Sequence, residues 1–117
     1  GHPLRVDFVL FTQVLVNLID NANKYSPPER PIDISFDAQT DCWRIEVRDQ
    51  GSGIPEDDRE KVFEKFFRRS DTRTSGSGLG LAISRGLVEA HGGSLVARTG
   101  PGGGTVMSIR LPQGVSA

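Results

Sequence analysis

Cysteine, long apolar runs and an excess of one charge are all scarce in this chain, and each scarcity excludes a class of protein. The single cysteine, Cys42, cannot form an internal disulfide or a zinc site built from several cysteines, which favours a reducing cytosolic setting. The longest nearly apolar stretch, residues 8–19, is interrupted by Thr12, Gln13 and Asn17 and falls short of the roughly 20 residues that a membrane-spanning helix needs. We therefore expect that these residues do not insert directly into a membrane.

The charges are balanced, with 14 Lys and Arg against 15 Asp and Glu and a formal net charge of −1. This balance argues against a general surface for nucleic acid or for anionic membranes. The length of 117 residues allows one continuous core, so we expect a single domain over residues 1–117 without internal repeats. The opening Gly1-His2-Pro3 is typical of a tag remnant, so residues 1–6 are expected to be partly tag or a truncated first strand, and 113–117 a frayed tail.

The spacing of apolar residues predicts both helices and strands. Apolar residues recur at helical spacing from Phe8 to Tyr25, and Ser26-Pro27-Pro28 ends that pattern. The expected elements are a helix over 8–25, strands over 32–36 and 43–47, helices over 56–67 and 79–91, and strands over 94–99 and 105–111. The fold class is α+β: a two-layer sandwich in which a mixed, mostly antiparallel sheet of about five strands is covered on one face by about three helices.

The first helix carries a polar stripe of Asn17, Asp20, Asn21 and Lys24, at positions i, i+3, i+4 and i+7. A solvated face is one interpretation, but such faces normally use Glu, Lys and Arg, and Asn and Asp are poor residues inside a helix. A functional interpretation fits better, because a carboxamide oxygen can ligate Mg²⁺, an acid can accept a proton and a lysine can neutralise phosphate. The stripe contains all three kinds of group: carboxamides, a carboxylate and a lysine.

Two glycine loops offer further binding groups. In residues 49–55, Asp49 can accept a hydrogen bond from an exocyclic amine, and Gly51 and Gly53 let the backbone approach a flat ring closely. Residues 76–81 open a helix, where unpaired N–H groups and the helix dipole favour phosphate. They form neither a Walker A loop nor a dinucleotide motif. Taken singly, either loop is also compatible with an ordinary tight turn.

Taken together in this order, the motifs resemble those of sensor histidine kinases. Residues 17–26 resemble the N box, 49–55 the first glycine box, 63–67 the F box and 76–81 the second glycine box. The resemblance covers roughly residues 7–112 and implies the Bergerat ATP-binding fold of the superfamily that includes the ATPase of DNA gyrase, the Hsp90 chaperones and MutL. The strings at 12–15 and 24–28 are also similar to those of the potassium-responsive KdpD group.

The resemblance implies a role for each polar residue of the first helix. Asn21 would ligate Mg²⁺, and Asn17 would support the metal and the phosphates of ATP. Lys24 would contact phosphate, and Tyr25 would line the nucleotide pocket. Asp20 takes the place of the general base, where many members of the family have the longer Glu.

It also implies the residues that hold the base and close over the phosphates. Asp49 would bind the adenine amino group, and Thr105 would assist Asp49 through hydrogen bonding or water. The adenine pocket would be shaped by Gly51, Gly53 and Ile54. The residues expected to close on the phosphates are Gly76, Gly78, Leu79 and Gly80.

Three aromatic residues and one histidine leave other interpretations open. Phe63, Phe66 and Phe67 fit either a core role or contact with a partner helix. His91 lies at a predicted helix end, where a capping or packing role is favoured over catalysis, so we do not identify it as a phosphoacceptor.

The activity implied by the resemblance is that of an ATP-dependent protein-histidine kinase. Its γ-phosphoryl group would go to a histidine on a separate dimerisation domain, with a response regulator downstream. The full-length protein would be a homodimer, and this chain the cytosolic domain of a membrane-anchored sensor. The alternatives are another ATPase or an anti-sigma-type serine kinase of the superfamily, or a non-catalytic interaction domain that retains the fold.

Overall fold

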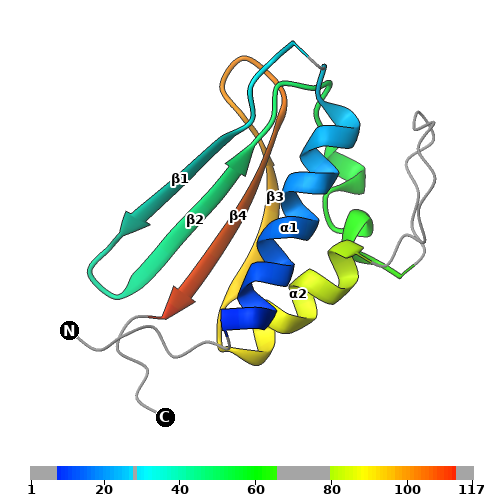
Figure 1. Cartoon of the computed structure of the whole chain (residues 1–117). Helices are drawn as coiled ribbons and strands as arrows, with labels where there is room; N and C mark the ends of the chain where they lie inside the picture. Colours follow the sequence, from blue (N-terminus) through cyan, green and yellow to red (C-terminus); the bar gives the residue numbers. More distant parts are fainter. Residues whose placement is uncertain (1–7, 28, 66–79, 113–117) are drawn as a thin grey trace.

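The fold is a two-layer sandwich with an antiparallel sheet on one side and helices on the other (Figure 1). The structure is a computed structural model that describes residues 8–27, 29–65 and 80–112. Its order is α1 (Phe8–Tyr25), β1 (Asp33–Ala38), β2 (Cys42–Arg48), η1 (Glu56–Asp58), η2 (Lys61–Phe63), α2 (Gly80–Ala90), β3 (Ser94–Thr99) and β4 (Thr105–Pro112). The predicted α+β class is confirmed, and α1 has the predicted bounds.

The sheet has the order β1-β2-β4-β3, and each pair of neighbours is antiparallel. Within the described residues the sheet therefore has four strands, not about five, and no parallel pair makes it mixed. The prediction of a fifth strand depended on residues 1–6, which lie outside the described residues. No helix in the described part of the chain is long and apolar enough to span a bilayer.

The core lies between the helices and one face of the three strands β2, β4 and β3. Ile45 of β2 lies opposite Ile109 of β4, which in turn lies opposite Leu95 of β3, so one cross-strand row is entirely apolar and buried. Val14 and Leu18, four residues apart on α1, pack against this row because residues at i and i+4 share one face of a helix. This packing holds α1 along the sheet and fixes where its polar stripe lies.

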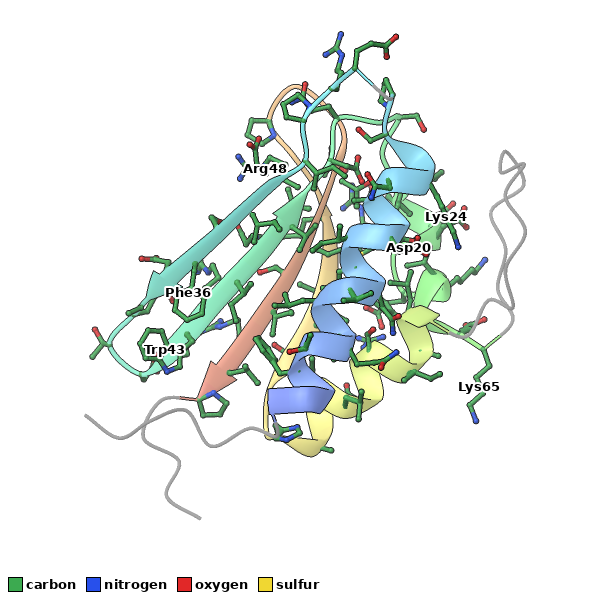
Figure 2. The ribbon with its side chains drawn as sticks, viewed as in Figure 1. Asp20, Lys24, Phe36, Trp43, Arg48 and Lys65 are labelled. Atoms are coloured by element: carbon green, nitrogen blue, oxygen red, sulfur yellow. The ribbon has the colours of Figure 1, made fainter. Side chains whose placement is uncertain are left out.

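The edge strand β1 is more exposed than its alternating apolar residues, typical of a half-buried strand, would indicate. Ile34 and Phe36 are 53% and 59% exposed, although they lie opposite Val47 and Ile45 of β2 and therefore share the face that the helices cover. The helices do not extend over this strand in Figure 1. Phe36 instead contacts Trp43, with the ring centroids 5.1 Å apart (Figure 2).

The helix predicted over 56–67 is also different, because its described part forms the two short 3-10 turns η1 and η2. The backbone at Glu64 is extended, with φ −74° and ψ 146°, which ends the second turn. The turns are held by separate partners instead of one helical stripe: Arg59 donates a hydrogen bond to the Thr99 hydroxyl at 2.8 Å, and Phe63 lies under the guanidinium of Arg85. Phe66 and Phe67 lie outside the described residues.

The second helix, α2, ends one residue before its predicted end. Gly92 has a positive φ of 80°, and the N–H groups of Gly92 and Gly93 donate to carbonyls of the last helical turn. The Nδ1 atom of His91 lies 2.7 Å from the carbonyl oxygen of Leu87. His91 therefore occupies the helix end as predicted, with its ring engaged by the backbone.

Candidate functional site

The ends of α1, β2 and the β3–β4 turn lie at the same end of the molecule (Figure 1). Asp49 follows directly after β2 there and is buried, with 5% of its surface exposed. Its Oδ1 atom accepts hydrogen bonds from the backbone N–H groups of Gly51 at 2.9 Å and Thr105 at 3.2 Å. Among the described residues its Oδ2 atom has no partner, so a buried carboxylate presents one acceptor to a ligand.

Thr105 contacts Asp49 through its backbone. Its carbonyl accepts a hydrogen bond from the Asp49 N–H at 2.9 Å, while its own N–H donates to the Asp49 side chain. The hydroxyl of Thr105 has no hydrogen-bond partner among the residues described, and the side chain is buried. The two residues therefore contact each other through the backbone of Thr105, and the role of Thr105 in nucleotide binding stays a prediction.

Two glycines bring the backbone of the β3–β4 turn against the Asp49 loop. Gly53 and Gly104 have positive φ angles of 83° and 77°, which residues with side chains rarely adopt. A Cβ atom on Gly53 would lie 3.2 Å from the carbonyl oxygen of Gly104, and a Cβ on Gly104 would lie 2.3 Å from the carbonyl oxygen of Asp49. The glycines thus let the protein pack its own backbone around Asp49, with Ile54 buried beside them in the core.

The polar stripe of α1 begins with Asn17, which contacts α2. Its Nδ2 atom donates to the hydroxyl of Ser84 at 3.2 Å and to the carbonyl of Gly80 at 3.4 Å. Gly80 is the first residue of α2 and belongs to the predicted phosphate-binding loop. The structure therefore places Asn17 of the N-box-like segment against Gly80 of the second glycine-box-like segment.

The next turn of the stripe carries Asp20, Asn21 and Lys24. The Nζ atom of Lys24 lies 3.4 Å from the Oδ2 atom of Asp20, and their side chains are 33% and 64% exposed. Figure 2 shows both on the side of α1 that faces away from the β1–β2 hairpin. Such an exposed i, i+4 pair is held weakly, so both groups can turn toward a ligand. Asn21 is half-buried, and its amide has no hydrogen-bond partner in the described residues.

Arg85 of α2 joins this helix to the turns η1 and η2. Its guanidinium lies 4.6 Å from the centre of the Phe63 ring and 3.0 Å from a carboxylate oxygen of Glu60, and it also pairs with Glu89 at 3.6 Å. Glu60 and Phe63 lie before residues 66–79, which the structure does not describe, and α2 begins directly after those residues. Arg85 thus ties together the two described elements that flank this part of the sequence.

Part of the predicted phosphate-binding loop lies in residues 66–79, which the structure does not describe. Gly76, Gly78 and Leu79 lie outside the described residues, as does the side chain of Tyr25, although Tyr25 itself is the last residue of α1. Sequence reasoning also missed two residues that contact the site, Gly104 and Ser84. The sequence signal for Gly104 is the run Gly102-Gly103-Gly104 between the strands predicted over 94–99 and 105–111, and this run indicates only a hairpin turn.

The groups around this end of the molecule fit a nucleotide with a divalent cation. The buried Asp49 carboxylate has an acceptor for an amine, and the α1 stripe offers an amide oxygen from Asn21 and a cation from Lys24. In the described residues, no group of three or more His, Cys, Asp or Glu side chains is placed to hold a metal ion. A single amide ligand is compatible with Mg²⁺, which usually takes most of its ligands from phosphate and water.

Comparison with known proteins agrees with this chemistry. A sequence family described as histidine kinase-, DNA gyrase B- and HSP90-like ATPase matches residues 6–115. The chain is 43% identical to the sensor histidine kinase WalK of Bacillus subtilis, covering 93% of this chain and 19% of WalK. It is 38% identical to the sensor protein KdpD of Escherichia coli, covering 94% of this chain and 12% of KdpD. It therefore spans about a fifth or less of these relatives.

Solved structures show the same similarity. The mycobacterial sensor histidine kinase MprB superposes with a TM-score of 0.86 and 36% sequence identity, covering 93% of this chain and 76% of that structure. The agreement covers the antiparallel sheet and the helices that pack against it.

Proposed function

Because the chain belongs to the family of histidine kinase-, DNA gyrase B- and HSP90-like ATPases, we propose that it binds Mg-ATP and phosphorylates a histidine on a separate dimerisation domain. Its curated relatives are sensor histidine kinases. The observation that supports the proposal most directly is Asp49, a buried carboxylate whose Oδ1 is held by two backbone N–H groups while Oδ2 is left for a ligand. An adenine amino group can donate a hydrogen bond to this Oδ2 atom, and a hydrogen bond to a charged carboxylate is stronger than one between neutral groups.

We assign the adenine end of the site to the Asp49 loop. Asp49 accepts the amino group, while Gly51, Gly53 and Ile54 shape the surface against the ring. Thr105 keeps Asp49 in place through the backbone hydrogen bonds in both directions. The close approach of Gly53 to Gly104 holds this loop against the β3–β4 turn, so we expect the backbone around Asp49 to shift little when the ligand binds.

We assign the phosphate end to α1 and the start of α2. The amide oxygen of Asn21 is the protein ligand for Mg²⁺, with Asn17 supporting the metal and the phosphates, and Lys24 neutralises phosphate charge. Tyr25 lines the pocket, and the backbone of Gly76, Gly78, Leu79 and Gly80 closes on the phosphates. When bound, Mg²⁺ neutralises charge that develops during phosphoryl transfer.

Asp20 accepts the proton in the reaction that we propose. A bond forms between the γ-phosphorus and an imidazole nitrogen of the substrate histidine, the bond to the β–γ bridging oxygen breaks, and ADP leaves. The substrate histidine belongs to the dimerisation domain of the full-length protein. The phosphoryl group then passes from this histidine to a response regulator. His91 does not serve as the acceptor, because its ring lies against the Leu87 carbonyl at the far end of α2.

Titration calorimetry with a non-hydrolysable ATP analogue, with and without Mg²⁺, tests the first half of this proposal. We expect binding at millimolar concentrations or tighter, and stronger binding with Mg²⁺. Incubation with labelled ATP and a dimerisation domain then tests transfer, which we expect only when that domain is present. Absence of analogue binding would indicate a non-catalytic interaction domain, and ATP hydrolysis or serine phosphorylation without transfer to histidine would indicate another ATPase or kinase of the superfamily.

The substitution Asn21→Ala is expected to remove the Mg²⁺ dependence of analogue binding. Binding in the presence of Mg²⁺ should weaken about tenfold, roughly 1.4 kcal/mol, because one ligand of the cation is lost, while binding without Mg²⁺ should hardly change. Calorimetry at matched ionic strength measures both values. Asn23→Ala is the matched control, since Asn23 is an exposed asparagine on the same helix. A Mg²⁺ dependence that survives in Asn21→Ala would count against its role as a ligand.

A further inference from the structure

Ser84 is a buried polar residue for which the four sequence motifs provide no role. It lies on α2, one turn after Gly80, and its exposed fraction is 0%. Its hydroxyl accepts a hydrogen bond from the Nδ2 atom of Asn17 at 3.2 Å, across the contact between α1 and α2. A serine inside a helix is less favourable than alanine, and burial of its hydroxyl adds a cost unless a hydrogen bond compensates it.

The contact with α2 fixes which way the Asn17 amide points. The second group near Nδ2 is the carbonyl oxygen of Gly80, at 3.4 Å, and a carbonyl oxygen can only accept a hydrogen bond. The amide nitrogen must therefore face α2, and the two orientations of the amide are not equivalent. The Oδ1 atom consequently faces away from Ser84 and Gly80, and it has no partner among the described residues.

We propose that Ser84 is a positioning residue that orients the Asn17 carboxamide for Mg-ATP, an inference that rests on the proposed function. With both amide hydrogens held by α2, the amide oxygen is directed away from α2 before the nucleotide binds. The rotation of the side chain is then already restricted, so binding loses less conformational entropy. The Gly80 contact alone is longer and holds the amide less firmly.

A purely structural role makes a different prediction. Ser84 could serve only as a small residue that allows α1 and α2 to approach, and alanine would then serve equally well. The hydroxyl matters for the positioning role alone, because Ser84→Ala removes one acceptor and leaves the helix contact otherwise intact. The two roles are therefore separated by nucleotide affinity and not by stability.

The test is calorimetric titration of the 117-residue chain carrying Ser84→Ala with the Mg-bound ATP analogue and, separately, with adenosine. We expect Mg-analogue binding to weaken about two- to tenfold, the range of one hydrogen bond, and adenosine binding to stay unchanged. Ser84→Cys, which keeps a similar size and a weaker acceptor, should fall between serine and alanine. Ser108→Ala, which truncates a buried serine in the sheet, is the matched control and should bind both ligands as the unsubstituted chain does.

A double-mutant cycle with Asn17→Ala shows whether Ser84 acts through Asn17. In that background, Ser84→Ala should cause no further loss of Mg-analogue affinity. Equal binding by Ser84→Ala and the unsubstituted chain, equal weakening for adenosine, or the same loss in the Asn17→Ala background would each overturn the inference. If the unsubstituted chain binds no Mg-analogue, the proposed function itself fails, and the inference fails with it. Thermal unfolding of each variant confirms that it is folded during the titration.

Discussion

Replacement of Asp49 by asparagine is expected to remove most of the affinity for ATP, with a loss of about 1.5 to 3 kcal/mol, or roughly 10- to 150-fold. Two backbone N–H groups, those of Gly51 and Thr105, donate to the Oδ1 atom of Asp49. In Asp49→Asn these donors keep the carbonyl oxygen of the new amide at the Oδ1 position. The amide nitrogen then occupies the Oδ2 position and points a donor at the donor of the adenine amino group.

The structure thus makes the expected loss larger than that of a simple charge removal. If the side chain were free to rotate, asparagine could turn its oxygen toward the ligand and recover part of the binding. That rotation would place an NH₂ group against two backbone N–H groups in a buried site, which is unfavourable. The amide of the variant can therefore accept the hydrogen bonds of the backbone or that of the ligand, but not both.

Titration calorimetry with ATP and with inosine triphosphate measures this effect. Inosine triphosphate has a carbonyl oxygen in place of the amino group, so Asp49→Asn should bind it with a smaller loss than it shows for ATP. Asp41→Asn, at an exposed aspartate before β2, controls for the change in net charge and should leave ATP binding unchanged. A variant that binds ATP as tightly as the unsubstituted chain would contradict the adenine role of Asp49.

The sequence predicted the elements whose local pattern and tertiary packing agree. The helical spacing of Val14 and Leu18 matches the buried side of α1, and the alternation of Ile45 and Val47 matches the buried face of β2. For β1 the pattern was misleading, since Ile34 and Phe36 have the alternation of a covered strand and yet lie beyond the helices. Alternation reveals which residues share a face, but an adjacent element decides whether that face is buried.

The candidate site also shows that local sequence pattern does not reveal contacts between distant residues. The α1 stripe could be predicted because Asn and Asp are unusual inside a helix, and Asp49 could be predicted because its glycine loop stands in the family's order of motifs. The contact of Ser84 with Asn17 joins residues 67 positions apart, and nothing local in the sequence indicates it. Thr105 and Asp49, 56 positions apart, could be paired only through the family resemblance. The segment after Pro55 shows why tertiary contacts matter, since its partners Thr99 and Arg85 lie on different elements and replace a continuous helix by two turns.

Gly104 is the residue at which a small substitution should disturb both the fold and the site. In Gly104→Ala the new Cβ would lie 2.3 Å from the carbonyl oxygen of Asp49 and 3.2 Å from the Cα atom of Gln50, and these backbone atoms cannot move aside cheaply. The φ angle of 77° adds a conformational cost of about 1 to 2 kcal/mol for alanine. We expect the free energy of unfolding to fall by about 3 kcal/mol and ATP affinity to fall at least tenfold, roughly 1.4 kcal/mol, because the backbone that positions Asp49 must shift.

Gly102→Ala separates the contact from the backbone conformation. Gly102 lies in the same turn with a similar φ of 85°, but a Cβ atom there would meet no atom within 4 Å. This variant should therefore lose only about 1 kcal/mol of unfolding free energy and keep its ATP affinity. Urea denaturation and titration calorimetry of the two variants measure both quantities. Equal losses in the two variants would show that the turn conformation alone matters, and that the close packing of Gly104 on Asp49 does not hold the nucleotide site.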